Sequence, residues 1–79
     1  MHHKSITETL KTRRIRLQVT QETLSLLTGL GLRTIKQMES GKGNPTLETI
    51  QKIADVLGLA LRLDIKNLTS ENEVNNDTL

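Results

Sequence analysis

The spacing of the hydrophobic residues changes at Gly58. Before that glycine, apolar residues recur every three or four positions, which is the period of an amphipathic helix. After it, apolar and polar residues alternate, which is the period of a β-strand. The pattern predicts helices over about 6–17, 21–28, 32–40 and 47–57, and one strand over 59–66. We therefore expect a mainly α domain with a single strand at its C-terminal end.

Residues at the expected helix ends support these bounds. Ser5, three positions before Glu8, forms a capping box, and Thr20 can cap the second helix. Gly29 is suited to end that helix, and Thr46 introduces the fourth. The positions expected to face inward are Ile6, Leu10, Arg14 and Leu17, then Leu24, Leu27 and Thr28, then Ile35 and Glu39, and lastly Leu47, Ile50, Ile53, Ala54 and Leu57.

Two of the inward positions carry charges. Arg14 lies in the apolar row of the first helix and Glu39 in that of the third. Removing one member of a buried ion pair typically costs on the order of 3 to 5 kcal/mol, so neither charge is expected to be alone. We therefore predict that Arg14 and Glu39 form a salt bridge between the two helices. The alternative is that the first helix rolls until both charges reach water.

The composition argues against several classes of function. With no cysteine and no aromatic residue, the chain has no thiol nucleophile, no disulfide and no ring on which to stack a single-stranded base. The only histidines, His2 and His3, make a poor metal site without a third ligand. No set of catalytic groups is assembled, so we expect neither an enzyme nor a cofactor. No apolar run is long enough to cross a membrane, and we expect a cytoplasmic protein.

Charge is distributed unevenly along the chain. All eleven Lys and Arg lie at or before Lys66, together with six acidic residues, whereas residues 67–79 carry three acids. A basic body favours a polyanionic partner. Residues 67–79 are rich in Asn, Ser, Thr and Glu, so we expect a disordered polar tail after a domain over 1–66.

The expected second and third helices are joined by a short turn at Gly29, which is the arrangement of a helix-turn-helix. Residues at characteristic spacings surround this turn, namely Thr20, Gln21, Leu24, Gly29, Thr34, Ile35, Glu39, Gly41, Asn44, Pro45, Thr46, Leu57 and Gly58. In these residues the chain resembles the Cro/C1-type (XRE) DNA-binding domains of phage repressors and bacterial regulators. The resemblance covers residues 13–58 and implies a lambda-repressor-like fold of four helices that binds double-stranded DNA. Ser25 and Gly31 depart from the family, which usually has Ala in the second helix and Ser or Thr at the cap of the third.

The expected strand is a further departure, because members of this family commonly have a fifth helix at that point. A helix-turn-helix domain followed by one strand is similar to the antitoxin subunits of Hip-type toxin-antitoxin modules, in which the strands of two subunits pair across the dimer axis. A lone amphipathic strand has no partner in its own chain, and a second copy can supply one. The alternatives are a strand that packs within its own monomer and a segment without order.

The charges of this strand predict how two copies pair. The residues expected at the dimer interface are Leu61, Arg62, Leu63, Asp64 and Ile65. In a two-fold antiparallel pair centred on Leu63, Arg62 of one copy lies opposite Asp64 of the other. A centre at Arg62 or at Asp64 instead places like charges opposite each other. We therefore predict that Leu63 lies at or near the axis of a homodimer.

The resemblance also implies which side chains face DNA. In this family the third helix lies in the major groove and the second crosses the phosphate backbone. The implied base contacts are Leu32 with a thymine methyl, Arg33 with a guanine edge and Gln37 with an adenine edge. The implied phosphate contacts are Gln21, Thr34, Lys36, Ser40, Lys42 and Asn44.

Two functions are compatible with these features. The first is a homodimeric transcriptional regulator, most often a repressor, that binds an inverted repeat and is associated with the nucleoid. The second, implied by the resemblance to Hip-type subunits, is an antitoxin that holds a kinase-like toxin and represses its own promoter. Leu26 and Val56 are apolar at outward positions and are candidates for a partner surface. A stand-alone repressor of the phage or mobile-element type, without a toxin partner, is the alternative.

Overall fold

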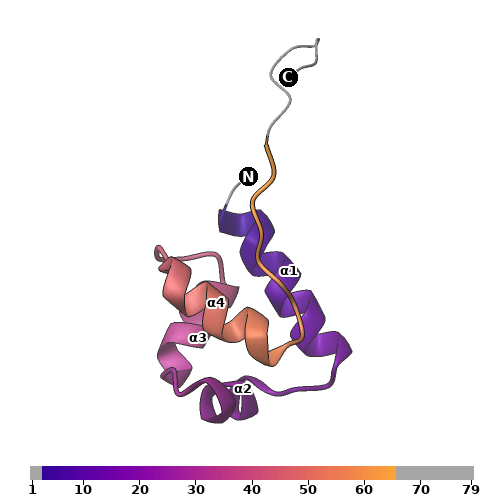
Figure 1. The fold of residues 1–79 in the computed structure, drawn as a ribbon. Coiled ribbons are helices and arrows are strands. Elements are labelled where there is room, and N and C mark those ends of the chain that lie inside the picture. The colour runs from indigo at the N-terminus through magenta and orange to yellow at the C-terminus, as the bar shows by residue number, and fades with distance from the viewer. Residues whose placement is uncertain (1–2, 66–79) are drawn as a thin grey trace.

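A computed structural model describes residues 3–65, which contain four α-helices (Figure 1). They are α1 (His3–Arg16), α2 (Gln21–Thr28), α3 (Leu32–Glu39) and α4 (Leu47–Val56). In Figure 1, α2 lies across the lower end of the molecule, and α3 and α4 lie to one side of α1. The prediction of a mainly α domain of four helices is confirmed, and each expected bound is met to within three residues.

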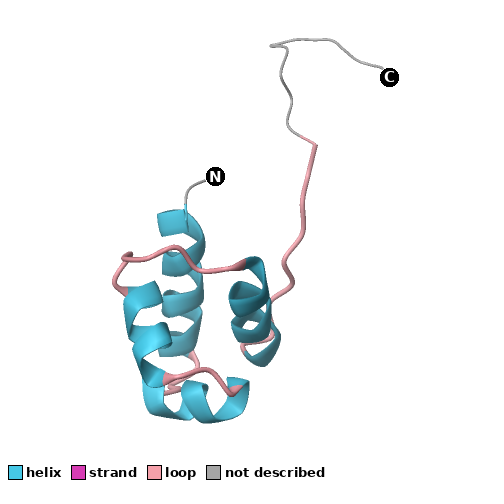
Figure 2. Cartoon of the chain, turned by 90° about the vertical axis from the view of Figure 1, so that its left-hand side faces the viewer, coloured by secondary structure: helices cyan, strands magenta, loops and turns pink. Residues whose placement is uncertain are grey.

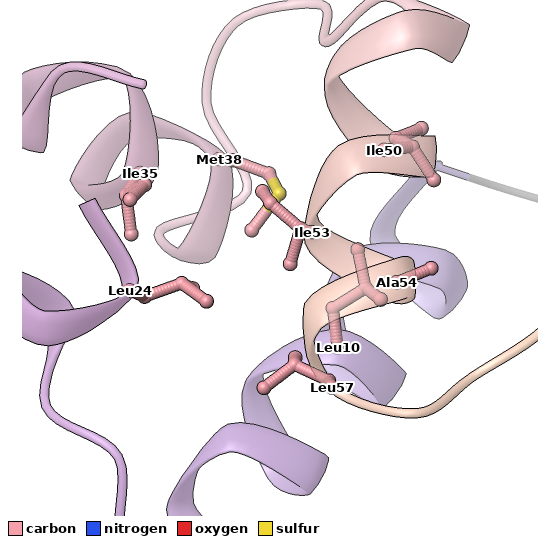
Figure 3. Close-up of a cluster of buried hydrophobic side chains, with 8 residues drawn as sticks. All are labelled: Leu10, Leu24, Ile35, Met38, Ile50, Ile53, Ala54 and Leu57. Atoms are coloured by element: carbon pink, nitrogen blue, oxygen red, sulfur yellow. The ribbon is translucent and has the colours of Figure 1, made fainter. Parts of the chain in front are cut away.

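The core is one cluster of aliphatic side chains to which all four helices contribute (Figure 3). Leu24 of α2, Ile35 of α3 and Ile53 of α4 are fully buried at its centre. Burying an aliphatic side chain of this size contributes about 1.5 to 3 kcal/mol, so a small cluster can hold a domain of this length together. Its members are Leu10, Leu24, Ile35, Met38, Ile50, Ile53, Ala54 and Leu57.

Threonine hydroxyls cap two of the helices, as the sequence predicts. The hydroxyl of Thr20 accepts a hydrogen bond from the backbone N–H of Thr23 at 3.0 Å, and α2 begins directly after Thr20. The hydroxyl of Thr46 accepts the equivalent bond from Thr49 at 3.1 Å before α4. Each bond satisfies one backbone donor that the first turn of a helix leaves unpaired.

The bounds of α1 differ from the expectation at both ends. The helix begins at His3, so Ser5 lies within its first turns and the predicted capping box is wrong. The preceding residues contain no helix breaker, and extending an existing helix is easier than starting one. At the other end, Gln18 adopts φ 60°, and the N–H of Val19 donates to the carbonyl of Arg14 at 3.1 Å. This left-handed termination at a non-glycine residue has no marker in the sequence.

Three residues expected to face inward are largely exposed instead. Leu17, Leu27 and Leu47 expose 44%, 59% and 69% of their surface. Leu17 lies beyond the end of α1, and Leu47 lies in the first turn of α4, where the described chain does not cover it. The covered face of α2 is centred between Gln21, Leu24 and Thr28, which turns Leu27 away from the core. The expected outward positions of Leu26 and Val56 are confirmed.

Residues 59–65 follow α4 as an extended segment that runs along α1 toward its N-terminal end and beyond the helices (Figures 1 and 2). The described part of this segment contains no β-strand, so the predicted strand over 59–66 is not confirmed. A strand whose only partner is a second copy has no hydrogen-bonded ladder within one chain. Leu59 and Leu61 pack against the core, whereas Leu63 and Ile65 are 97% and 100% exposed. Lys66 and the predicted tail over 67–79 lie outside the described residues.

Candidate nucleic-acid interface

The turn between α2 and α3 is held by side-chain hydroxyls. Ser25 donates to the carbonyl of Leu30 at 2.5 Å, and Thr28 accepts from the N–H of Leu30 at 3.2 Å. Gly29 adopts φ 77°, which lets its N–H bond the carbonyl of Ser25 at 2.9 Å. Ser25, a departure from the usual alanine of the family, thus adds a direct bond across the turn. These bonds hold the turn that joins α2 to α3.

One face of α3 is buried and the other is open to solvent. Ile35 is fully buried, and Met38 and Glu39 are only 2% and 8% exposed. The open face carries Arg33, Thr34, Lys36 and Gln37, and Leu32 at the first position is half-buried. An eight-residue helix is about 12 Å long and about 10 Å across, which suits the width of the major groove. The exposed charges of α3 are both positive, as a phosphate-rich partner requires.

Glu39 holds the inner face of α3 to the rest of the domain. Arg14 of α1 binds it in two places, with Nε 2.6 Å from Oε2 and Nη2 2.8 Å from Oε1. The third guanidinium nitrogen, Nη1, donates to the carbonyl of Val19 at 2.7 Å. The side chains of Arg14 and Glu39 are 11% and 3% exposed. The salt bridge predicted from the sequence is therefore formed, and α1 does not roll its charge into water.

Gln21 belongs to the same cluster. Its side-chain Nε2 donates to Oε1 of Glu39 at 3.0 Å, which links the first residue of α2 to the last residue of α3. The family resemblance implies that Gln21 contacts a phosphate. In this structure one hydrogen of its side-chain amide instead points inward, toward Glu39. An amide nitrogen carries two hydrogens, so the second remains able to donate to a phosphate.

Residues of α3 and of the loop before α4 surround a hollow of about 210 Å³. Thr34 and Gln37 line it from the helix, and Lys42 and Asn44 line it from the loop. Gly43, at φ 77°, allows the loop to turn back toward the helix. The structure therefore brings together four of the residues implied to contact DNA, from two different segments of the chain.

Ser40 fits its expected role less well. Its hydroxyl donates to the carbonyl of Gln37 at 2.8 Å, within the last turn of α3. A hydroxyl has one hydrogen to donate, and a phosphate oxygen would have to replace that carbonyl as its acceptor. In this structure the hydroxyl of Ser40 stabilises the end of the helix.

Arg13 has a structural role that the sequence analysis does not assign. Its Nε donates to the carbonyl of Leu57 at 2.9 Å, at the C-terminal end of α4. Arg13 and Arg14 are adjacent, so their side chains leave α1 about 100° apart and reach different neighbours. The pair of adjacent arginines is the signal from which two separate contacts can be predicted.

The described residues hold no cluster of His, Cys, Asp or Glu suited to a metal ion. None of the described helices is long and apolar enough to span a bilayer.

A family model described as helix-turn-helix matches residues 10–63, which is most of the chain and includes α2, the turn and α3. No curated protein matches the chain. The family model agrees with the Cro/C1-type (XRE) resemblance, and it does not bear on the resemblance to Hip-type antitoxins. The chain belongs to the helix-turn-helix family, in its Cro/C1-type (XRE) branch, and is a DNA-binding transcriptional regulator.

Proposed function

We propose that this regulator is a repressor that binds an inverted repeat in double-stranded DNA as a homodimer. The observation that carries the proposal is the division of α3 into an anchored face and an open one. The anchored face ends in Glu39, which is held by Arg14 and Gln21. The open face presents the side chains of Arg33 and Gln37, which are both exposed to solvent.

Each side chain of the open face has a matching target in the major groove. Arg33 can bind N7 and O6 of a guanine with two hydrogen bonds, and Gln37 can bind N6 and N7 of an adenine. Leu32, half-buried at the start of α3, can touch a thymine methyl. These three residues are proposed to select the sequence.

Other residues of the same surface are proposed to position the protein on the phosphates. Lys36 and Lys42 are exposed cations, and Thr34 and Asn44 can donate hydrogen bonds beside them. Lys42 and Asn44 come from the loop before α4, so they can reach the backbone beside the groove that α3 occupies. These contacts are proposed to add affinity for any sequence and to make it salt-dependent.

The homodimer is supported by the segment after α4. Its apolar residues alternate with polar ones, and within the described residues Leu63 and Ile65 are almost fully exposed. Antiparallel pairing of two such segments about Leu63 satisfies their backbone groups and covers this row. A two-fold symmetric protein presents two copies of α3 in opposite directions, which matches an inverted repeat.

We further propose that the protein is the antitoxin of a toxin-antitoxin module, with a kinase-like toxin as its partner and its own promoter as its target. The extended segment that follows α4, where related domains have a helix, favours this role. Leu26 of α2 is 84% exposed and offers an apolar contact for a partner. A stand-alone repressor of the phage or mobile-element type is the second candidate. Co-expression with the product of the neighbouring gene distinguishes the two, because an antitoxin relieves the toxicity of that product and a stand-alone repressor does not.

Selection of bound duplexes from a random pool tests the binding function. The proposal predicts enrichment of an inverted repeat that binds two chains, and a reporter gene placed behind that repeat is expected to be repressed. Enrichment of a single site without symmetry would contradict the homodimer, and increased reporter expression would contradict repression.

A further inference from the structure

An apolar groove lies where the N-terminal end of α1, the start of α4 and the C-terminal segment meet. Its volume is about 690 Å³, and its apolar walls are Ile6, Leu47, Ile50, Leu61 and Leu63. Leu47 is 69% exposed. The core therefore does not extend into this groove, and apolar side chains of three segments line it.

The row of apolar residues on the C-terminal segment continues past the groove. Residues two apart in an extended chain point to the same side, and Leu59, Leu61, Leu63 and Ile65 form such a row. Leu59 and Leu61 are partly buried against the core, whereas Ile65 is 100% exposed. Figure 2 shows that the segment after α4 extends away from the four helices. Ile65 thus lies too far along the chain to be covered by its own core.

The charges of the segment favour a second copy of the chain as the cover. Arg62 and Asp64 lie on the polar side of the segment, 79% and 75% exposed, with Nη2 and Oδ1 3.5 Å apart. Antiparallel pairing about Leu63 places each of these charges opposite its counterpart in the other copy. Shifting the register by one residue would place polar residues opposite apolar ones. Shifting it by two residues would centre the pair on Arg62 or Asp64 and place like charges opposite each other.

This register determines where Ile65 goes. When Leu63 faces its own copy, Ile65 of one chain lies directly opposite Leu61 of the other. Leu61 is a wall of the groove, and Ile6, Leu47 and Ile50 are the other walls there. We propose that the groove is the seat of Ile65 from a second copy, so that each subunit closes the core of the other; this inference rests on the proposed homodimer.

The two-fold axis makes the exchange reciprocal. Each copy donates one Ile65 and receives one, and the two Leu63 side chains meet between the grooves. The contact removes apolar surface of Leu47, Leu63 and Ile65 from water, which is the driving force for association. The groove is therefore a dimerisation site on the helical body, in addition to the backbone pairing of the segments.

Sedimentation equilibrium of the full chain tests this site with Ile65→Ala, Leu47→Ala and the double variant. Ile65→Ala is expected to raise the dimer dissociation constant about a hundredfold, because each dimer loses two buried side chains. Leu47→Ala is expected to raise it by a smaller factor. The double variant is expected to resemble Ile65→Ala alone, because the two residues act through one contact. Helical circular dichroism should not change, since neither side chain belongs to the core cluster.

Leu26→Ala is the matched control, because Leu26 is an exposed leucine on α2 and not a wall of the groove. A dimer that responds to Ile65→Ala no more than to Leu26→Ala would overturn the groove as the seat of Ile65 and leave the homodimer standing. Additive effects of Leu47→Ala and Ile65→Ala would overturn it as well. A wild-type chain that remains monomeric at millimolar concentration would overturn the homodimer itself and this inference with it.

Discussion

Arg14 and Glu39 form a bidentate ion pair in which both carboxylate oxygens of Glu39 accept hydrogen bonds from one guanidinium. The pair joins α1 to the inner face of α3, and the same guanidinium binds the carbonyl of Val19 before α2. Three segments of the chain are therefore oriented by one side chain. The direction in which the outer face of α3 points depends on this contact.

Arg14→Ala is expected to lower the free energy of unfolding by about 3 to 5 kcal/mol, because it leaves the carboxylate of Glu39 buried without its positively charged partner. Replacing both residues by apolar ones, Arg14→Met with Glu39→Leu, should cost much less, since no buried charge remains. Urea unfolding followed by circular dichroism measures both values. The control is Lys52→Ala, which breaks an exposed pair with Glu48 and should cost about 0.5 kcal/mol or less. An Arg14→Ala value as small as that of the control would contradict the anchoring role.

Gly31→Ser is expected to stabilise the domain by about 0.5 to 1 kcal/mol. Gly31 occupies the cap position of α3 at φ −66°, where no side chain caps the helix. A Cβ atom added at this position would meet nothing within 4 Å. A serine would supply that bond and reduce the freedom of the unfolded chain. Gly29→Ala is the contrasting variant and should be destabilising, because Gly29 has φ 77°. Thermal unfolding compares the two, and a destabilised Gly31→Ser would show that the cap position is constrained in another way.

Lys42→Ala is expected to weaken binding to all duplexes alike. The loss of one phosphate contact should reduce the slope of log affinity against log salt concentration by about 0.9. Fluorescence anisotropy titrations at several salt concentrations measure that slope on the selected site and on an unrelated duplex. Lys52→Ala removes an equal charge from α4 and serves as the control. A larger loss on the selected site than on the unrelated duplex would assign Lys42 to base recognition instead.

Leu63→Cys is expected to form an intermolecular disulfide readily under mild oxidation. The chain has no cysteine of its own, so any cross-link reports the introduced residue. Pairing about Leu63 brings the two copies of this position face to face, whereas two copies of Arg62 are displaced along the strands. Non-reducing electrophoresis should therefore show faster cross-linking for Leu63→Cys than for Arg62→Cys. The opposite order would reject Leu63 as the centre of the dimer.

The sequence predicted the helices well because their signals are local. Periodic apolar rows and the caps at Thr20 and Thr46 depend only on neighbouring residues, and the structure has them. The Arg14–Glu39 pair was predictable because two charges on apolar faces require each other. These features sufficed to identify α3 as the helix with an open face.

Other features depend on contacts that no local pattern encodes. The end of α1 at Gln18 uses a left-handed residue that is not glycine, and Leu47 is exposed because no described segment covers that end of α4. The inward bond of Gln21 could not be anticipated, since its family role concerns phosphate and its partner is Glu39. The strand over 59–66 is a different case, because its ladder requires a second chain. Its prediction stands until the oligomer is measured.

The most direct test of sequence reading by α3 is a parallel selection of bound duplexes by the wild-type chain and by Arg33→Ala. For the wild type we predict an inverted repeat with one strongly preferred guanine in each half-site. For Arg33→Ala we predict the same repeat with the preference lost at that guanine, and an affinity lowered by about 1 to 3 kcal/mol. Identical sequence preferences for the two proteins would contradict the assignment of Arg33, and no enrichment by the wild type would contradict the account of α3 as the recognition helix.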